Sequence, residues 1–255
     1  MSINWFLANA RQAAPRAQLF CLPYAGASAA VYRTWGALLG PAVEVLSTQL
    51  PGRGWRLREA PARDLHALAD QVAEAITARA DRPFAVFGHS MGAWLGLEVV
   101  RRLESAERNP LLFFASGRQA PSHGCTQPPM AHLDDEAFVG EVQTRYGGIP
   151  PELLAERELL ALLLPALRAD IELLENHEHR IRPIRTPIHA VVGDADPVVS
   201  REEMSAWSQE TAAGFRLTEL SGGHFYFQDD PGPLLALVRG QFDTLEDHPV
   251  LAKGA

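Results

Sequence analysis

The chain has 255 residues and a formal net charge of −8 at pH 7, which argues against a nucleic-acid-binding protein because such surfaces need clustered Lys and Arg. Its composition, 47% hydrophobic and 21% charged, is typical of a folded globular protein, and its length fits one α/β domain. The two cysteines, Cys21 and Cys125, are too few for a disulfide framework, so we expect a reducing, cytoplasmic setting.

The sequence offers neither a signal peptide nor a membrane span. The apolar patch near the N-terminus follows no basic segment, and its core is only about five residues long. The longest apolar run, 159–167, is interrupted by Pro165 and is far shorter than the roughly 18 residues that a membrane helix needs. We therefore expect no membrane association.

Short apolar runs alternate with helical patterns in the first half of the chain. The runs 17–22, 43–48, 84–88 and 111–115 are brief, rich in Val, Leu and Phe, and bounded by turn residues, which predicts strands. Apolar residues recur at helical spacing over 64–80, where Asp64 can cap the helix, and over 93–104. Strands buried on both faces and separated by helices predict an α/β fold with a mostly parallel sheet.

About seventy residues without a convincing strand then interrupt this alternation. Helical patterns are strongest over 134–146 and 156–177. The remaining elements are predicted as strands at 188–192 and 216–220, a helix from Arg201 capped by Ser200, and a last helix over 234–245. We predict a single domain, 1–255, in which an insertion at approximately 117–186 covers the carboxyl edge of the sheet as a helical lid; plain structural packing is the alternative.

The segment Gly88-His89-Ser90-Met91-Gly92 fits the pattern GxSxG at the end of a predicted strand and the start of a predicted helix. Such a turn lifts a serine hydroxyl clear of the backbone, and its glycines let neighbouring segments approach. The motif alone is weak, because a turn serine explains it equally well. If Ser90 is a nucleophile, it needs a base and a group that orients the base.

Suitable partners follow at the ends of later strands. One strand is followed by Asp194 and Asp196 and the next by His224, so these side chains emerge at the same sheet edge as Ser90. Separately, an Asx turn before proline and a solvent-facing loop histidine are plainer explanations. Together, and in this order, they favour a Ser90, Asp196 and His224 triad. Asp196 is preferred over Asp194 because it lies further beyond the strand and can reach the imidazole.

A tetrahedral intermediate also needs hydrogen-bond donors for its oxyanion. We expect the backbone N–H groups of Met91, next to the nucleophile, and of Ala25, in the loop after the first predicted strand. His89 is assigned a packing or hydrogen-bonding role, because consecutive side chains on a sharp turn diverge. His177 and His179 look like a metal pair, but no third ligand is apparent in the sequence, so we predict no metal.

Five segments carry a resemblance to a known family: LPYAGAS at 22–28, QLPGRG at 49–54, FGHSMG at 87–92, GDADPVV at 193–199 and GGHFY at 222–226. In these segments the chain resembles the type II thioesterases that accompany modular polyketide synthases and nonribosomal peptide synthetases, relatives of the medium-chain acyl-carrier thioesterases. The QLPGRG element discriminates best, because ordinary esterases and lipases share the triad motifs but usually not this one. Ala27 departs from the pattern, since the family often has a second glycine there.

The resemblance implies an α/β-hydrolase fold, a helical lid, and hydrolysis of acyl groups from the phosphopantetheine arm of an acyl or peptidyl carrier protein, in editing or product release. It implies no cofactor, since the substrate carries the phosphopantetheine. A small-molecule carboxylesterase or lipase, and a noncatalytic binding protein on a hydrolase scaffold, are the alternatives. We expect a monomer.

Two basic stretches are candidates for docking an acidic carrier protein. One contains Arg53, Arg56, Arg58 and Arg63, and the other runs from His179 to Arg185. A solvated face with neighbouring acidic residues is the more common role of such stretches, so carrier docking is the less favoured of the two interpretations.

Overall fold

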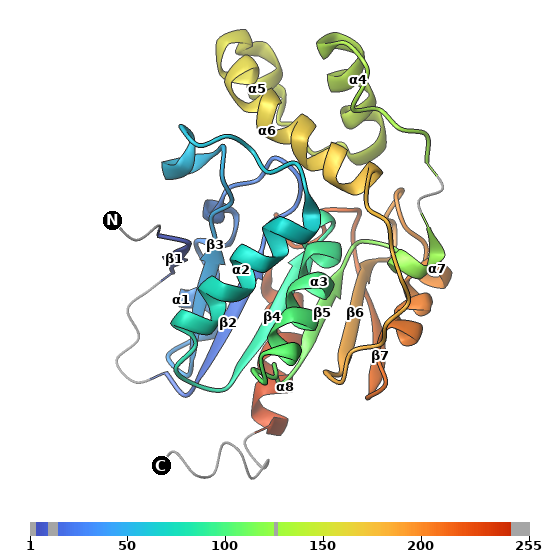
Figure 1. The fold of residues 1–255 in the computed structure, drawn as a ribbon. Coiled ribbons are helices and arrows are strands. Elements are labelled where there is room, and N and C mark those ends of the chain that lie inside the picture. Colours follow the sequence, from blue (N-terminus) through green and yellow to red (C-terminus); the bar gives the residue numbers. More distant parts are fainter. Residues whose placement is uncertain (1–3, 10–14, 125–126, 246–255) are drawn as a thin grey trace.

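The computed structural model describes residues 4–9, 15–124 and 127–245 (Figure 1). Cys125 lies outside the described residues, whereas Cys21 is a buried free thiol in a central strand. Within the described ranges, no helix is long and apolar enough to cross a membrane.

One sheet of seven strands forms the centre of the molecule, in the order β1-β3-β2-β4-β5-β6-β7. Its strands are β1 (Phe6–Ala8), β2 (Ala17–Leu22), β3 (Val43–Thr48), β4 (Phe84–His89), β5 (Phe113–Ser116), β6 (Ile188–Gly193) and β7 (Phe215–Leu220). All neighbouring strands pair in parallel except β1, which is antiparallel to β3. The predicted mostly parallel α/β sheet is therefore confirmed.

Helices cover both faces of this sheet (Figure 1). They are α1 (Trp35–Leu39), α2 (Leu65–Arg79), α3 (Met91–Ser105), α4 (Asp135–Tyr146), α5 (Pro151–Ala155), α6 (Arg157–Glu175), α7 (Arg201–Ser205) and α8 (Gly232–Leu245), with short 3-10 turns η1 (Ala29–Tyr32), η2 (Gly54–Arg56), η3 (Pro121–His123) and η4 (Ala206–Glu210). Alternate strand residues face opposite layers: Phe20 and Leu22 pack with α2 and α3, and Leu19 and Cys21 with α1 and α8.

The predicted starts of α2, α4 and α7 hold at residue level, whereas α3 and α8 begin two residues earlier than predicted. The Asp64 carboxylate accepts hydrogen bonds from the first backbone N–H groups of α2, and Asp134 does the same for α4. Ser200 caps α7 in a capping box with Glu203. The short helices α1 and α5 and the edge strand β1 were not predicted, because segments of three to five residues show no resolvable periodicity and, unlike α7, neither helix begins with a side-chain cap.

The segment between β5 and β6 carries η3, α4, α5 and α6, and we call it the lid segment (residues 117–186). In Figure 1 its helices α4, α5 and α6 stand above the sheet, and the end of α6 reaches the layer of α2 and α3, where Leu173 and Leu174 join the core. They share a small apolar cluster of their own that includes Phe138, Leu164 and Ile171. The lid segment is therefore held mainly by its own packing and by contacts at the carboxyl edge of the sheet.

Candidate active site

Ser90 occupies the sharp turn between β4 and α3. Its backbone has φ 53 and ψ −117, a conformation that non-glycine residues rarely adopt and that costs about 1–3 kcal/mol. Hydrogen bonds on both sides hold it: Ser90 N–H donates to Ser116 O at 2.8 Å, and Ala93 N–H donates to Ser90 O at 2.9 Å. The turn thus keeps the serine in a strained position at the sheet edge.

The turn requires glycine at positions 88 and 92, because a side chain would not fit there. A Cβ on Gly88 would lie 2.0 Å from Gly92 O, and a Cβ on Gly92 would lie 2.4 Å from Leu22 O. Both obstacles are backbone atoms, which cannot swing away. The GxSxG pattern therefore follows from the close approach of α3 to strands β4 and β2.

His224 and Asp196 meet in the loops after β7 and β6. His224 Nδ1 lies 3.0 Å from Asp196 Oδ2, and both side chains are buried. The other carboxylate oxygen, Asp196 Oδ1, accepts a hydrogen bond from Val198 N–H at 2.8 Å. Asp194 is exposed and instead accepts from Gly222 N–H at 2.9 Å, so Asp196 is the acid that contacts the imidazole. This geometry orients the histidine ring and leaves Nε2 as its outer nitrogen.

Ser90 and His224 line one cavity of about 170 Å³. His224 Nε2 is buried and has no hydrogen-bond partner within the described part of the chain. Much of the remaining wall is apolar and comes from the lid segment, with Val142, Tyr146, Ile149, Leu153, Leu160, Leu163, Leu164, Leu167, Ile171 and Leu174. The cavity can therefore receive an apolar group beside the serine.

His89 lies beside these residues but serves the packing of the site. Its Nδ1 lies 2.8 Å from Ser116 Oγ, and its ring packs 4.8 Å from that of Phe227 and 5.0 Å from that of His224. Burial holds the pKa of His89 well below its usual value, and the neighbouring His224 adds to this effect. A neutral His89 avoids placing a second positive charge beside His224.

The loop after β2 carries the predicted second oxyanion donor. Ala25 lines the same cavity as Ser90. The loop turns tightly, with Ala27 N–H donating to Tyr24 O at 3.1 Å, and its positive φ (76) falls on Gly26. Since Ala27 does not have a positive φ, an alanine there requires no rearrangement of the loop. Met91, the other predicted donor, is the first residue of α3, where backbone N–H groups lack partners within the helix.

A buried ion pair connects this loop to the lid segment, and the sequence analysis missed one half of it. Arg53 Nη2 lies 2.8 Å from Asp170 Oδ1, and Nη1 contacts Oδ2. The same Oδ2 accepts a hydrogen bond from Gly26 N–H at 2.8 Å. Arg53 is 1% exposed and Asp170 0%. The QLPGRG element therefore fixes helix α6 to the loop after β2 (residues 23–27), which we call the oxyanion loop after its predicted donor, Ala25.

Of the two basic stretches that are candidates for docking a carrier protein, the one that contains Arg53, Arg56, Arg58 and Arg63 is only partly exposed. Arg53 and Arg56 are buried, and the Arg56 guanidinium is paired with Glu59 at 2.6 Å, so neither is available to a partner protein. Arg58 and Arg63 remain exposed, and Arg63 pairs with Glu172 of α6. The first basic stretch is thus largely structural.

The chain is similar to several known proteins. Gramicidin S biosynthesis protein GrsT of Aneurinibacillus migulanus is 34% identical over 228 residues, which are 89% of each chain. Thioesterase PikA5 of Streptomyces venezuelae is 36% identical over 242 residues, 93% of this chain and 83% of that one. The structure of the type II thioesterase BorB from the borrelidin biosynthetic cluster superposes with a TM-score of 0.85 at 38% identity, covering 93% and 97% of the two chains.

The expected α/β-hydrolase fold is confirmed by this structural likeness and by the strand order. The family model described as a thioesterase domain matches residues 17–240, which include every strand except β1. The chain therefore belongs to the thioesterase family.

Proposed function

We propose that this thioesterase hydrolyses acyl groups from the phosphopantetheine arm of an acyl or peptidyl carrier protein, in editing or product release during polyketide or nonribosomal peptide biosynthesis. One observation carries the proposal: a strained serine and a histidine held by a buried aspartate line a single cavity whose remaining wall is largely apolar. The likeness to a gramicidin S biosynthesis protein, GrsT, and to a type II thioesterase from the borrelidin biosynthetic cluster, BorB, supports this substrate class.

In the acylation step, Ser90 Oγ attacks the thioester carbonyl carbon while His224 Nε2 takes the hydroxyl proton. Asp196 holds the ring through Nδ1 and stabilises the imidazolium that forms. The carbonyl oxygen becomes an oxyanion, which accepts hydrogen bonds from the backbone N–H groups of Met91 and Ala25. When the carbon–sulfur bond breaks, the proton on Nε2 passes to the departing pantetheine sulfur, which leaves as the thiol.

In the deacylation step, a water molecule takes the place of the thiol. His224 accepts a proton from the water, which attacks the Ser90 ester carbonyl, and the same two backbone donors receive the oxyanion again. Collapse of the intermediate returns the proton to Ser90 Oγ and releases the carboxylic acid. Of the groups that this cycle uses, Ser90, His224 and Ala25 all line the one cavity.

The substrate and the nucleophile can be tested together. We expect the enzyme to hydrolyse an acyl-carrier protein with a higher kcat/KM than the matching acyl-pantetheine, and the latter better than a nitrophenyl ester of the same acid. Ser90→Ala should abolish turnover and retain binding of the acyl-carrier protein, whereas Ser105→Ala, at the other end of α3, should leave both unchanged.

Labelling by a fluorophosphonate provides the second measurement, because only an activated serine reacts with it at a useful rate. We expect mass spectrometry to find the label on Ser90. Labelling elsewhere, or hydrolysis retained by Ser90→Ala, would exclude the mechanism. A preference for the nitrophenyl ester over the carrier-bound substrate would favour a small-molecule esterase instead.

A further inference from the structure

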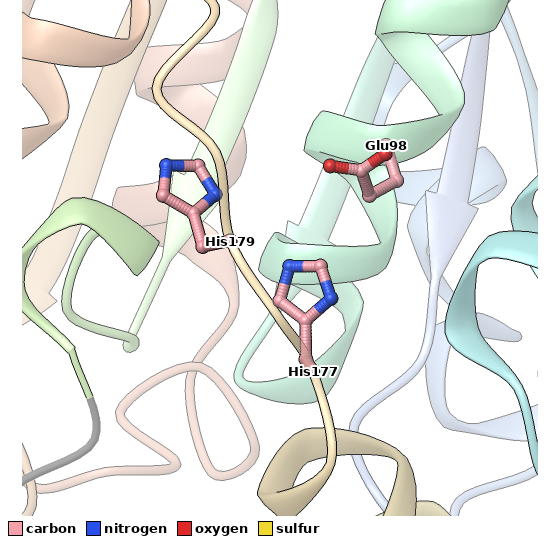
Figure 2. Close-up of side chains that lie close together, drawn as sticks. All are labelled: Glu98, His177 and His179. Carbon is pink, nitrogen blue, oxygen red and sulfur yellow. The ribbon is translucent and has the colours of Figure 1, made fainter.

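A second group of polar side chains lies away from the catalytic cavity, where the lid segment returns to the sheet. His177 and His179 stand two positions apart on the chain after α6, and Glu98 comes from helix α3 (Figure 2). The sequence analysis found no third ligand beside the histidine pair and predicted no metal on that ground. The fold supplies the missing side chain, which is distant along the chain.

The three side chains are close enough to share one ion. One ligand atom from each lies within 4.8 Å of the others. Bonds of about 2.0–2.2 Å from a tetrahedral zinc ion place its ligand atoms roughly 3.3 Å apart, so the group must contract by roughly 1.5 Å. The histidines lie outside any helix or strand, and rotation of their rings can supply much of this movement.

The ring nitrogens of both histidines are buried without a properly directed hydrogen bond from any described residue. Buried polar atoms in folded proteins nearly always have a partner, so the three nitrogens that contact no acidic side chain among the described residues, both of His177 and Nδ1 of His179, call for a ligand. His179 Nε2 lies 2.9 Å from Glu210 Oε1, a carboxylate in the position that commonly supports a metal-binding histidine. With Nε2 facing Glu210, Nδ1 of His179 is the nitrogen left for an ion.

The charges around the group decide which ion fits. Glu98 contacts Arg101 and Arg102, and Glu210 contacts Arg101, so the carboxylates are already compensated and an ion must displace a guanidinium contact. A hard cation such as Ca²⁺ or Mg²⁺ needs several oxygen ligands and gains little from imidazole. Two imidazoles and one carboxylate suit Zn²⁺, whose bonds to nitrogen can repay that displacement.

We propose that Glu98, His177 and His179 bind a divalent transition-metal ion of the Zn²⁺ type, supported by Glu210. Such an ion would fasten the segment that follows α6 to the core helix α3, at the base of the lid segment. The site is separate from the chemistry at Ser90, so its test does not depend on the proposed substrate.

The test is a titration of chelator-treated full-length protein with Co²⁺, followed by displacement with Zn²⁺. We expect one equivalent of Co²⁺ to give the strong visible absorption of a tetrahedral site, and Zn²⁺ to remove it. His177→Gln, His179→Gln and Glu98→Gln should each abolish the stoichiometric band, and Glu210→Gln should weaken binding about 10- to 100-fold. His123→Gln is the matched control, because this histidine also faces a carboxylate, Glu203, at 3.7 Å but belongs to no group of three potential ligands among the described residues.

A protein that shows no saturable Co²⁺ or Zn²⁺ binding would overturn the proposal. The same holds if His177→Gln and His179→Gln bind the ion as tightly as the unchanged chain. Circular dichroism and thioester hydrolysis, measured on each variant, distinguish a lost ligand from a lost fold, since neither histidine lines the catalytic cavity.

Discussion

Replacing Asp170 with Asn removes the negative charge that lies between helix α6 and the oxyanion loop. In the structure this carboxylate accepts two hydrogen bonds from Arg53 and one from Gly26 N–H. An asparagine of nearly the same size keeps one acceptor oxygen but leaves the Arg53 guanidinium buried without a counter-charge. The substitution therefore tests whether the ion pair fixes both the lid segment and the loop.

The expected loss of stability follows from the burial of the pair. Removing one partner of a fully buried ion pair costs about 3–5 kcal/mol, because the remaining charge stays desolvated. For a chain of this size each kcal/mol lowers the melting temperature by about 2–4 °C, so we expect a decrease of about 6–20 °C. Thermal unfolding followed by circular dichroism measures it.

Catalysis should fall independently of stability, because Gly26 N–H loses its anionic acceptor and the neighbouring Ala25 is no longer held beside the cavity. Loss of one oxyanion donor costs about 10²- to 10³-fold in kcat, which sets the upper limit for a displaced loop. The double variant Arg53→Met/Asp170→Leu removes both charges and should recover much of the stability, as buried ion pairs often tolerate apolar replacement. It should not recover kcat, since Gly26 N–H remains unpaired.

Glu172→Gln provides the matched control on the same helix. Glu172 pairs with Arg63 at 2.9 Å, but both side chains are exposed, so its loss should cost less than about 1 kcal/mol and leave kcat unchanged. Two results would refute the reasoning: a melting temperature of Asp170→Asn equal to that of Glu172→Gln, or a double variant that regains full kcat.

Three further predictions follow from the structure. Gly92→Ala places a Cβ 2.4 Å from a backbone oxygen, so hydrolysis and melting temperature should both drop. Leu163→Trp should lower kcat/KM for long acyl chains more than for short ones because Leu163 lines the cavity, whereas the exposed Leu162→Trp should not. Burial lowers the pKa of His189 from 6.5 to about 4 in the folded protein. The unfolded chain therefore binds this proton more readily, and the free energy of unfolding should fall as the pH is lowered from about 6.5 to about 4. The free energy of unfolding, measured with urea, should depend less steeply on pH in His189→Gln, by at most about 1.4 kcal/mol per pH unit.

The central strands could be predicted from the sequence because each is a short apolar run buried on both faces. β2 and β3 match their predicted limits, and the others differ by two residues or fewer. Edge strand β1 escaped prediction because its three residues are partly exposed and derive their conformation from pairing with β3. The other edge strand, β7, was predicted although none of its residues is fully buried, because its six residues give a longer signal than the three of β1.

Some polar residues of the site could likewise be predicted from the sequence, and others could not. Ser90, Asp196 and His224 could be singled out because each follows a recognisable strand, whereas Arg53 and Asp170 lie 117 positions apart with no local sign of their contact. One signal was present: Asp170 falls three residues after Leu167 and seven after Leu163, on the apolar stripe of α6. An acidic residue on such a stripe requires a buried partner, although only the fold shows which one.

Helix α6 has two roles that constrain how a substrate can enter. It lines the catalytic cavity with Leu163 and Leu167, and its Asp170 holds the oxyanion loop. Moving the whole helix would therefore break a buried ion pair, at a cost of about 3–5 kcal/mol. The start of α4 is tied to it as well, since Arg168 donates to Leu133 O at 2.6 Å. Helix α5 has no buried residue, yet its Leu153 lines the cavity. We therefore expect substrate entry to require a displacement of α5 and not of α6, which leaves the oxyanion loop in place for the reaction.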